Sequence, residues 1–126
     1  MKILSIVESA YRGTLEEQDD TVLWLNHALK NNGADVSLLL RGNAVNYIVR
    51  GHDASGLIIG DRPLAHPPQL DKDVAKLMAA GVGVYVVEED VGERGLQPGD
   101  TIDGFELVAR SGLPALLDRF DRVWHW

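Results

Sequence analysis

Polar side chains that could bind a ligand or do chemistry follow four predicted strands of the chain. They stand in segments 8–11, 41–43, 88–90 and 110–112. In an open parallel sheet, ligands bind beyond the carboxyl ends of the strands, where loops and helix N-termini meet. We therefore expect any pocket to lie among these segments. The candidate pocket residues are Glu8, Ser9, Tyr11, Asn43, Glu88 and Ser111.

Glu8 stands directly after an apolar segment at residues 3–7. A carboxylate at a strand end is often half-buried, a setting in which pKa values are perturbed and functional groups occur. The same side chain could instead cap a neighbouring helix, and the sequence leaves both interpretations open. The acidic run at residues 88–90 could hold a hard cation or supply a general base. It is more typical of a helix start whose carboxylates face the helix dipole and water.

Metal and nucleotide sites are not predicted. His52, Asp53, Asp61 and His66 lie within fifteen residues of one another, but they follow no familiar ligand spacing. No glycine-rich nucleotide-binding pattern occurs, and the first predicted strand leads into Glu8 instead of a phosphate cradle. We expect no cofactor.

Nucleophilic catalysis has little support in the sequence. The chain has no cysteine, so it can form neither a disulfide nor a thiolate centre. Ser9 and Ser111 lack the sequence context of a nucleophile elbow. His125 stands between two tryptophans and is expected to be a packed or interface residue.

Short apolar segments rich in β-branched residues predict the strands that carry these side chains. The predicted strands are residues 3–7, 35–40, 82–87, 105–109 and 122–126. Residues 52–68 are left open between a short strand and a buried loop.

Helical patterns separate the predicted strands. A helix is expected to open at Thr14, where Thr14 and Glu17 form a capping box, and to stop at Gly33. A short helix is expected at residues 44–50. Another follows at residues 70–78 with Asp71 as its cap, and a last one at residues 113–120.

Strands that alternate with helices imply parallel βαβ units with right-handed crossovers. Continuously apolar strands are typical of a sheet covered on both faces. The sequence therefore predicts an α/β fold, a three-layer flavodoxin-like sandwich with a mostly parallel sheet of about five strands. A length of 126 residues suits a single domain spanning residues 1–126.

Charge and hydropathy limit the classes of partner that the chain is expected to bind. Nineteen acidic residues against twelve basic ones give a net charge of −7, which repels phosphate backbones and anionic lipids, so neither nucleic acid nor a membrane is an expected partner. The apolar runs are far shorter than the roughly 20 residues of a membrane helix. We expect a cytoplasmic protein.

Three stretches, in this order, resemble the DsrE/DsrF-like family of small sulfur-relay proteins, specifically its DsrE/TusD branch. Residues 9–14 resemble that branch's small-Ala-Tyr-Gly-Thr turn, with Arg12 as an extra residue. Residues 84–95 are similar to its central strand, helix and Arg-Gly turn, and residues 111–123 to its Ser-Gly-Leu helix and Asp-Arg-Val strand. The likeness spans nearly the whole chain and is weakest at residues 52–68.

The resemblance implies a parallel α/β fold and assembly into trimers or hexamers, either of one chain or with sister subunits. It also implies a persulfide-carrying cysteine at the end of the central strand. That position here is Val87, which therefore joins the candidate pocket as a lost functional residue. Valine offers neither a nucleophile nor an atom that can hold sulfane sulfur.

Three hypotheses follow. The first is a non-catalytic, oligomeric scaffold or binding subunit associated with sulfur transfer or oxidation. The second is an enzyme or binder of a small molecule or metal that reuses the same pocket without a thiol. The third is a regulator that competes with a cysteine-bearing relative for the same assembly.

Overall fold

The computed structural model describes residues 1–10, 20–52 and 55–126. Its centre is a five-stranded, wholly parallel sheet with the strand order β6-β5-β2-β1-β7. The strands are β1 (Lys2–Val7), β2 (Asp35–Leu40), β5 (Gly83–Val87), β6 (Glu106–Val108) and β7 (Arg122–His125). The predicted α/β sandwich and the positions of all five predicted strands are confirmed.

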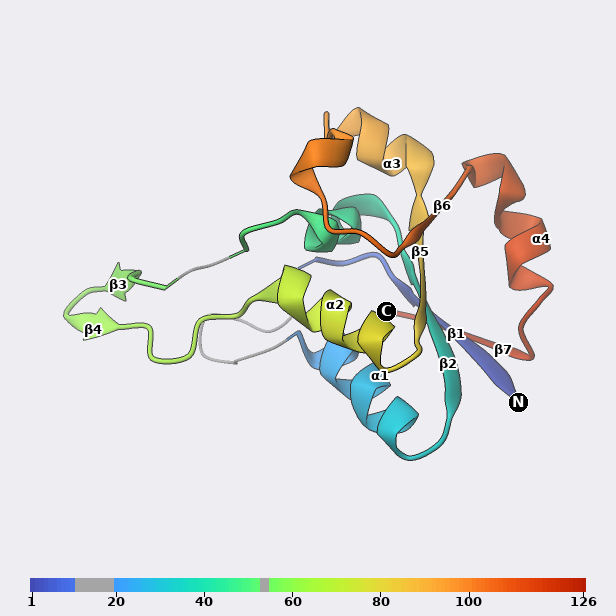
Figure 1. Ribbon diagram of the computed structural model, residues 1–126, viewed down its shortest axis with the longest axis horizontal. Coiled ribbons are helices and arrows are strands. Elements are labelled where there is room, and N and C mark those ends of the chain that lie inside the picture. The colour runs from blue at the N-terminus through green and yellow to red at the C-terminus, as the bar shows by residue number, and fades with distance from the viewer. Residues whose placement is uncertain (11–19, 53–54) are drawn as a thin grey trace.

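Helices cover both faces of the sheet (Figure 1). The chain passes from β1 to β2, β5 and β6 in one direction across the sheet, so right-handed crossovers place the intervening elements on one face. The last connection runs back to β7, beyond β1, and its helix packs on the opposite face. The first face carries α1 (Thr21–Asn31), the 3₁₀-helix η1 (Gly42–Ile48), α2 (Leu70–Ala79) and α3 (Glu88–Glu93).

The hydrophobic core is therefore divided unequally by the sheet. The larger cluster lies under α1, η1 and α2 and includes Val7, Leu38 and Val86. The smaller one packs under α4 (Leu113–Leu117), which follows the 3₁₀-helix η3 (Arg110–Gly112). Because the central strands contact both layers, their residues are apolar on both sides, as the sequence predicts.

Asp20 is the N-cap of helix α1 and is 1% exposed. Its Oδ1 accepts hydrogen bonds from the backbone N–H groups of Val22 (2.8 Å) and Leu23 (3.2 Å). The predicted capping box at Thr14 and Glu17 lies outside the described residues. The predicted stop at Gly33 is confirmed, with a φ of 88° that favours glycine.

The short helix predicted at residues 44–50 is confirmed with shifted bounds, as the 3₁₀-helix η1 (Gly42–Ile48). The predicted cap of the next helix was wrong. Asp71 was expected to cap α2, but Gln69 occupies the N-cap position. The Asp71 carboxylate accepts the backbone N–H of Gly51 at 3.0 Å, so this acid joins two segments of the chain instead of closing its own helix.

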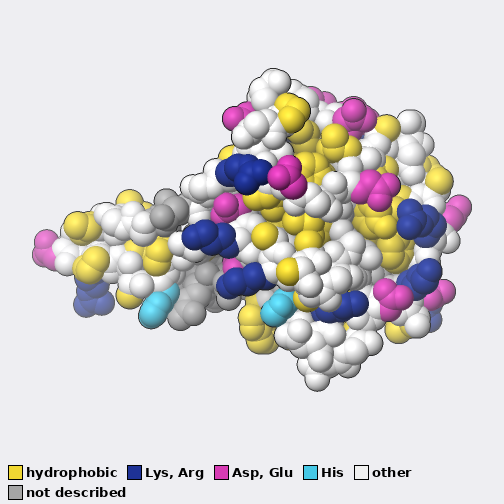
Figure 2. All heavy atoms as spheres, in the orientation of Figure 1, with side chains coloured by type: hydrophobic (Ala, Val, Ile, Leu, Met, Phe, Trp, Pro, Cys, Tyr) yellow, Lys and Arg dark blue, Asp and Glu magenta, His cyan; other side chains and the backbone are white. Residues whose placement is uncertain are grey.

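Of the two alternatives left open for residues 52–68, the short strand is confirmed: β3 (Ile58–Ile59) is exposed and pairs antiparallel with β4 (Arg62–Pro63). We call residues 55–68 the arm. Figures 1 and 2 show that it projects from the body of the molecule, with hydrophobic side chains on its surface. The segment between β5 and β6 includes a last 3₁₀-helix, η2 (Pro98–Asp100).

Candidate functional site

The carboxyl ends of β1 and β7 are the point where the connections of the sheet diverge. β1 leads toward the α1 face, whereas β7 is reached from α4 on the other face. Such a switch point is the usual position of a ligand crevice in an open α/β sheet. Here the backbones stay joined beyond the strands, because the N–H of Glu8 donates to the carbonyl of Trp126 at 3.3 Å.

Glu8 lies at this switch point and pairs with His125. Nε2 of His125 lies 2.7 Å from Oε2 of Glu8, and since a carboxylate only accepts, that nitrogen carries the proton. The other oxygen lies 3.9 Å from Nε of Arg41. Within the described residues, Glu8 caps no helix and instead joins β1 to β7 and to the loop after β2. All three side chains are at least one-third exposed, and such pairs contribute about 0–1 kcal/mol each.

Gly42 allows the close approach of the loop after β2 to Glu8. Its φ is 56°, and a Cβ at this position would lie 3.4 Å from Cγ of Glu8. Its backbone N–H donates to Oδ2 of Asp90 at 2.8 Å. A residue with a side chain here would meet backbone strain and contact Glu8, so glycine suits this turn.

Asp90 is the most buried acid at this edge, with 8% of its surface exposed. Besides the Gly42 N–H, it accepts a bond from the Arg110 guanidinium, 2.8 Å from Oδ1. It therefore joins the loops after β2 and β6 to the start of α3. The expectation of a helix start at residues 88–90 is confirmed, but Asp90 does not face water as that interpretation required.

Other candidate residues are distributed around this edge. Oδ1 of Asn43 accepts a bond from Arg94 at 2.7 Å, which links η1 to the end of α3. Ser9 and Ser111 are exposed, and within the described residues neither side chain makes a hydrogen bond. Glu88 is exposed and faces a separate groove beside β6. Tyr11 lies outside the described residues.

Val87 ends β5 and is 1% exposed. Its side chain belongs to the core cluster under α4, with Leu39 and Leu116 among its members. The residue therefore points into the hydrophobic core and presents no surface to a substrate. Helix α3 begins at the next residue, so the backbone turns away directly after Val87.

The carboxyl edge is a network of paired charges. The backbone N–H of Arg110 also donates to both carboxylate oxygens of Glu89, at 2.7 and 3.0 Å. The guanidinium of Arg110 lies 3.8 Å from the carboxylate of Glu93. The arginines here are held by acids or amides of neighbouring loops. This arrangement fastens loops together. Within the described residues, no group of three potential ligand side chains could hold a metal ion.

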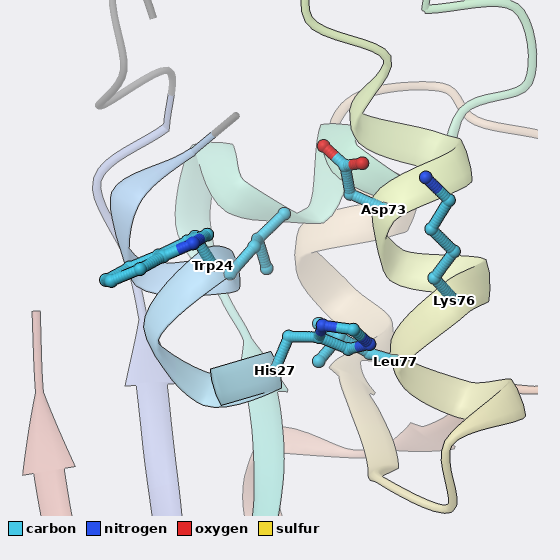
Figure 3. A pocket seen from close by; sticks show the side chains of 6 residues that line it. Trp24, His27, Asp73, Lys76 and Leu77 are labelled. Atoms are coloured by element: carbon cyan, nitrogen blue, oxygen red, sulfur yellow. The ribbon is translucent and has the colours of Figure 1, made fainter. Parts of the chain in front are cut away.

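At least three hollows open on the surface of the described residues. One of about 380 Å³ runs between α3, η2 and β6, and Glu88, Phe105 and Leu107 are among its walls. A second of about 520 Å³ lies between α1 and β7. The third holds about 130 Å³ between α1 and α2, where His27 reaches toward Leu77 (Figure 3). Because ligand pockets occupy roughly 300–1,000 Å³, only the first two have room for a ligand or a partner's side chains.

Sequence reasoning missed the residues that organise the edge. His125 was expected to be a packed or interface residue, yet it pairs with Glu8 across 117 positions of sequence. Arg110 was not singled out, although it joins Asp90 to the loop after β6. The sequence did indicate that these residues share one edge, because parallel strands all end at the same edge of a sheet. Which of the residues are neighbours depends on the order of the strands, and only the structure gives that order.

The fold places the chain in the class of parallel α/β sandwich proteins. No protein-family model matches the chain, and no curated protein is significantly similar to it in sequence. Each of three similar structures covers at least 98% of the chain.

The particular structures are as follows. The ychN protein from E. coli has a TM-score of 0.76 and 23% identity, covering 99% of this chain and 98% of its own. Two proteins of unknown function are similar as well. BT1422 from Bacteroides thetaiotaomicron has a TM-score of 0.69 and 12% identity over 99% of this chain and 95% of its own. MTH1491 from Methanobacterium thermoautotrophicum has a TM-score of 0.62 and 15% identity over 98% of this chain and 97% of its own. At these identities the likeness shows the fold.

Among the described residues, none of the helices has the length and apolar character needed to cross a membrane.

Proposed function

We propose that this chain is a non-catalytic DsrE-like protein, an oligomeric scaffold or binding subunit associated with sulfur transfer or oxidation in the cytoplasm. The observation that carries the proposal is Val87. The position where the resemblance implies a sulfur carrier holds an apolar side chain that is 1% exposed and packed in the core. The chain has no cysteine that could take over the role.

The surroundings of Val87 support binding over chemistry. Asp90 and Arg110 are bonded to each other, and Glu8 is bonded to His125. A general base needs a free acceptor atom aimed at a substrate, whereas both carboxylate oxygens of Asp90 accept bonds from neighbouring loops. A rigid edge of this kind suits a subunit that presents a fixed surface to a partner.

Restoring a thiol tests whether the strand end is closed. We expect the thiol of Val87→Cys to react with a disulfide reagent about a hundredfold more slowly than that of Ser111→Cys, because it must await a local opening of the core. Ser111 is exposed on a neighbouring loop, and the absence of native cysteine leaves one thiol in each variant. Reaction rates followed by absorbance, with and without denaturant, give the comparison. Equal rates in the native state would contradict a buried strand end.

Self-association is the second part of the proposal, as a trimer, a hexamer or a mixed assembly with DsrE-family subunits. Its support is apolar surface that one copy leaves exposed, namely Leu57, Ile58 and Ile59 on the arm and Val123 on β7. Tryptophan, which is enriched at interfaces, also lines the β7 surface at Trp124 and Trp126.

Sedimentation at micromolar concentration tests this part directly. We expect a species of three or more chains, with the proportion of oligomer rising with concentration. Capture of the tagged protein from native extract then separates self-association from mixed assembly, since only a mixed assembly retains other subunits of similar size. A monomer throughout the micromolar range, with no subunit captured, would overturn the proposal.

The alternative is a small-molecule or metal-binding enzyme that works without a thiol. The groove of about 380 Å³ favours it, because Glu88 lies in its wall beside apolar side chains such as Phe105. A panel of metabolites and metal ions should then raise the melting temperature, since a ligand at 100 times its Kd stabilises by roughly 2.7 kcal/mol. A Glu88→Gln variant that removes the shift would place the ligand in this groove.

A further inference from the structure

The arm is the largest concentration of exposed hydrophobic side chains in the described structure. Seven large hydrophobic residues are exposed among the described residues, and three of them are consecutive in the arm: Leu57 (42%), Ile58 (63%) and Ile59 (51%). The arm stands away from the body, so these side chains do not fold back onto the core (Figures 1 and 2). A two-stranded hairpin is at best marginally stable in water. A partner that covers these residues would stabilise the arm.

The same chain carries an apolar groove at the other end of its sequence. We call it the β7 groove. It is lined by Leu25 and Leu29 of α1 and by residues 123–126, and it has a volume of about 520 Å³. The rings of Trp124 and Trp126 meet edge to face at 6.5 Å and form its floor with α1. Room for several side chains and a tryptophan-rich wall are features of a protein-binding surface.

β7 is also an edge strand. In the described sheet it pairs with β1 on one side only. An edge strand presents unpaired backbone N–H and C=O groups, and it readily accepts another strand. A hairpin seated along β7 would find backbone partners as well as an apolar surface, so the shape of the arm suits this groove.

Charge distinguishes a second copy from other occupants. Each copy carries a net charge of −7, so most of its surface repels another copy. The arm contains one acid, Asp61, and one base, Arg62, and is neutral overall. Residues 122–126 contain one arginine and no acid. The arm and residues 122–126 can therefore approach each other without the repulsion expected between two acidic surfaces.

We propose that the arm of one copy seats in the β7 groove of the next copy. This inference rests on the proposed self-association and names the two surfaces that make it. Because the arm and the groove are different surfaces, the contact is heterologous, and repeating it closes a ring or extends a chain of subunits. Both halves of the contact belong to one sequence, so no other protein is needed to cover the arm.

Mixing two variants tests the proposal. The arm variant carries Ile58→Asp and Ile59→Asp, and the groove variant carries Val123→Asp, which is exposed and leaves the tryptophans in place. A matched control, Leu107→Asp, puts the same charge on an exposed residue of the opposite edge strand, β6. By sedimentation we expect the wild type and the control to be oligomers and each test variant to be a monomer. An equimolar mixture of the two test variants should form a dimer, because it contains one intact arm and one intact groove.

The other outcomes each contradict a defined statement. A wild-type monomer would overturn the proposed self-association itself. A wild-type oligomer with an oligomeric arm or groove variant would leave self-association standing and overturn this inference alone. If both test variants are monomers and their mixture also stays monomeric, the arm-to-groove contact is overturned, because one intact arm and one intact groove would then be insufficient. A monomeric Leu107→Asp variant would indicate that the arm binds at β6 and not at β7.

Cross-linking provides a measurement that does not depend on breaking the interface. The chain has no native cysteine, so Ile58→Cys and Val123→Cys each introduce a single thiol. Mixed under oxidising conditions, the two variants should form mainly the 58–123 disulfide between copies. A predominance of 58–58 or 123–123 products would overturn the heterologous contact.

Discussion

Replacing Asp20 by alanine should lower the free energy of unfolding by about 3 kcal/mol. The residue is 1% exposed and does two things at once. Its Oδ1 accepts the N–H groups of Val22 and Leu23 and so caps α1, a contribution of about 0.5–2 kcal/mol. Its Oδ2 accepts the hydroxyl of Tyr47, a fully buried residue of η1, and losing a buried partner costs about 1–3 kcal/mol.

Urea denaturation followed by circular dichroism measures this loss. Asp20→Asn is the matched control, because its amide oxygen can still cap the helix and we expect about half the effect. Tyr47→Phe removes only the hydroxyl, and a double-mutant cycle with Asp20→Ala isolates the energy of that contact. A loss of less than 1 kcal/mol for Asp20→Ala would mean that the helix start rearranges without it.

The second large effect is expected at Asp90. Replacement by alanine should cost about 2 kcal/mol, because it leaves the Gly42 N–H without its acceptor and removes a partner of the Arg110 guanidinium. Arg110 is half-exposed and can turn to water, so the loss is smaller than for a fully buried ion pair. Denaturation gives the energy, and hydrogen exchange at the Gly42 amide should become faster.

Glu93→Ala is the control for this prediction. It removes a longer, exposed contact to the same arginine, 3.8 Å from Oε1, and should change stability by less than about 0.5 kcal/mol. Asp90→Asn keeps an acceptor for Gly42 and should fall between the two. If Asp90→Ala and Glu93→Ala had equal effects, Asp90 would not be the residue that fastens these loops.

The two predictions concern acids that hold different parts of the fold together. Asp20 holds the layer of α1 and η1 together, and Asp90 holds the loops beyond the sheet. In both acids, the two carboxylate oxygens accept hydrogen bonds from other groups of the chain.

Much of the sheet could be predicted from the sequence. The three central strands are short, largely apolar on both faces and bounded by polar turns, and the two edge strands are short runs with bulky residues, so each is visible in a window of a few residues. The helix stop at Gly33 has the same local origin. The arm was not predictable in this way, because the sequence left the segment of Leu57, Ile58 and Ile59 open between a short strand and a buried loop, and only the tertiary structure shows that nothing in the described fold covers them.

The candidate site was likewise predictable only in part. Sequence position identified Glu8, Asn43 and Glu88 as strand-end residues, but it did not show which of them meet. Glu8 and His125 are at opposite ends of the chain and are joined only because β7 lies beside β1. Asp90 was judged a solvent-facing acid, since its burial depends on the loop of Gly42 and on Arg110.

By itself, the sequence determined the α/β class, the positions of the strands and the absence of any thiol, because each depends on local pattern or composition. Only the tertiary structure decided that Val87 points into the core, that the charges beyond the sheet are paired with one another, and that an apolar arm projects into solvent. Those features depend on which distant segments are packed together. That packing is the sum of many weak contacts, which no single stretch of sequence displays.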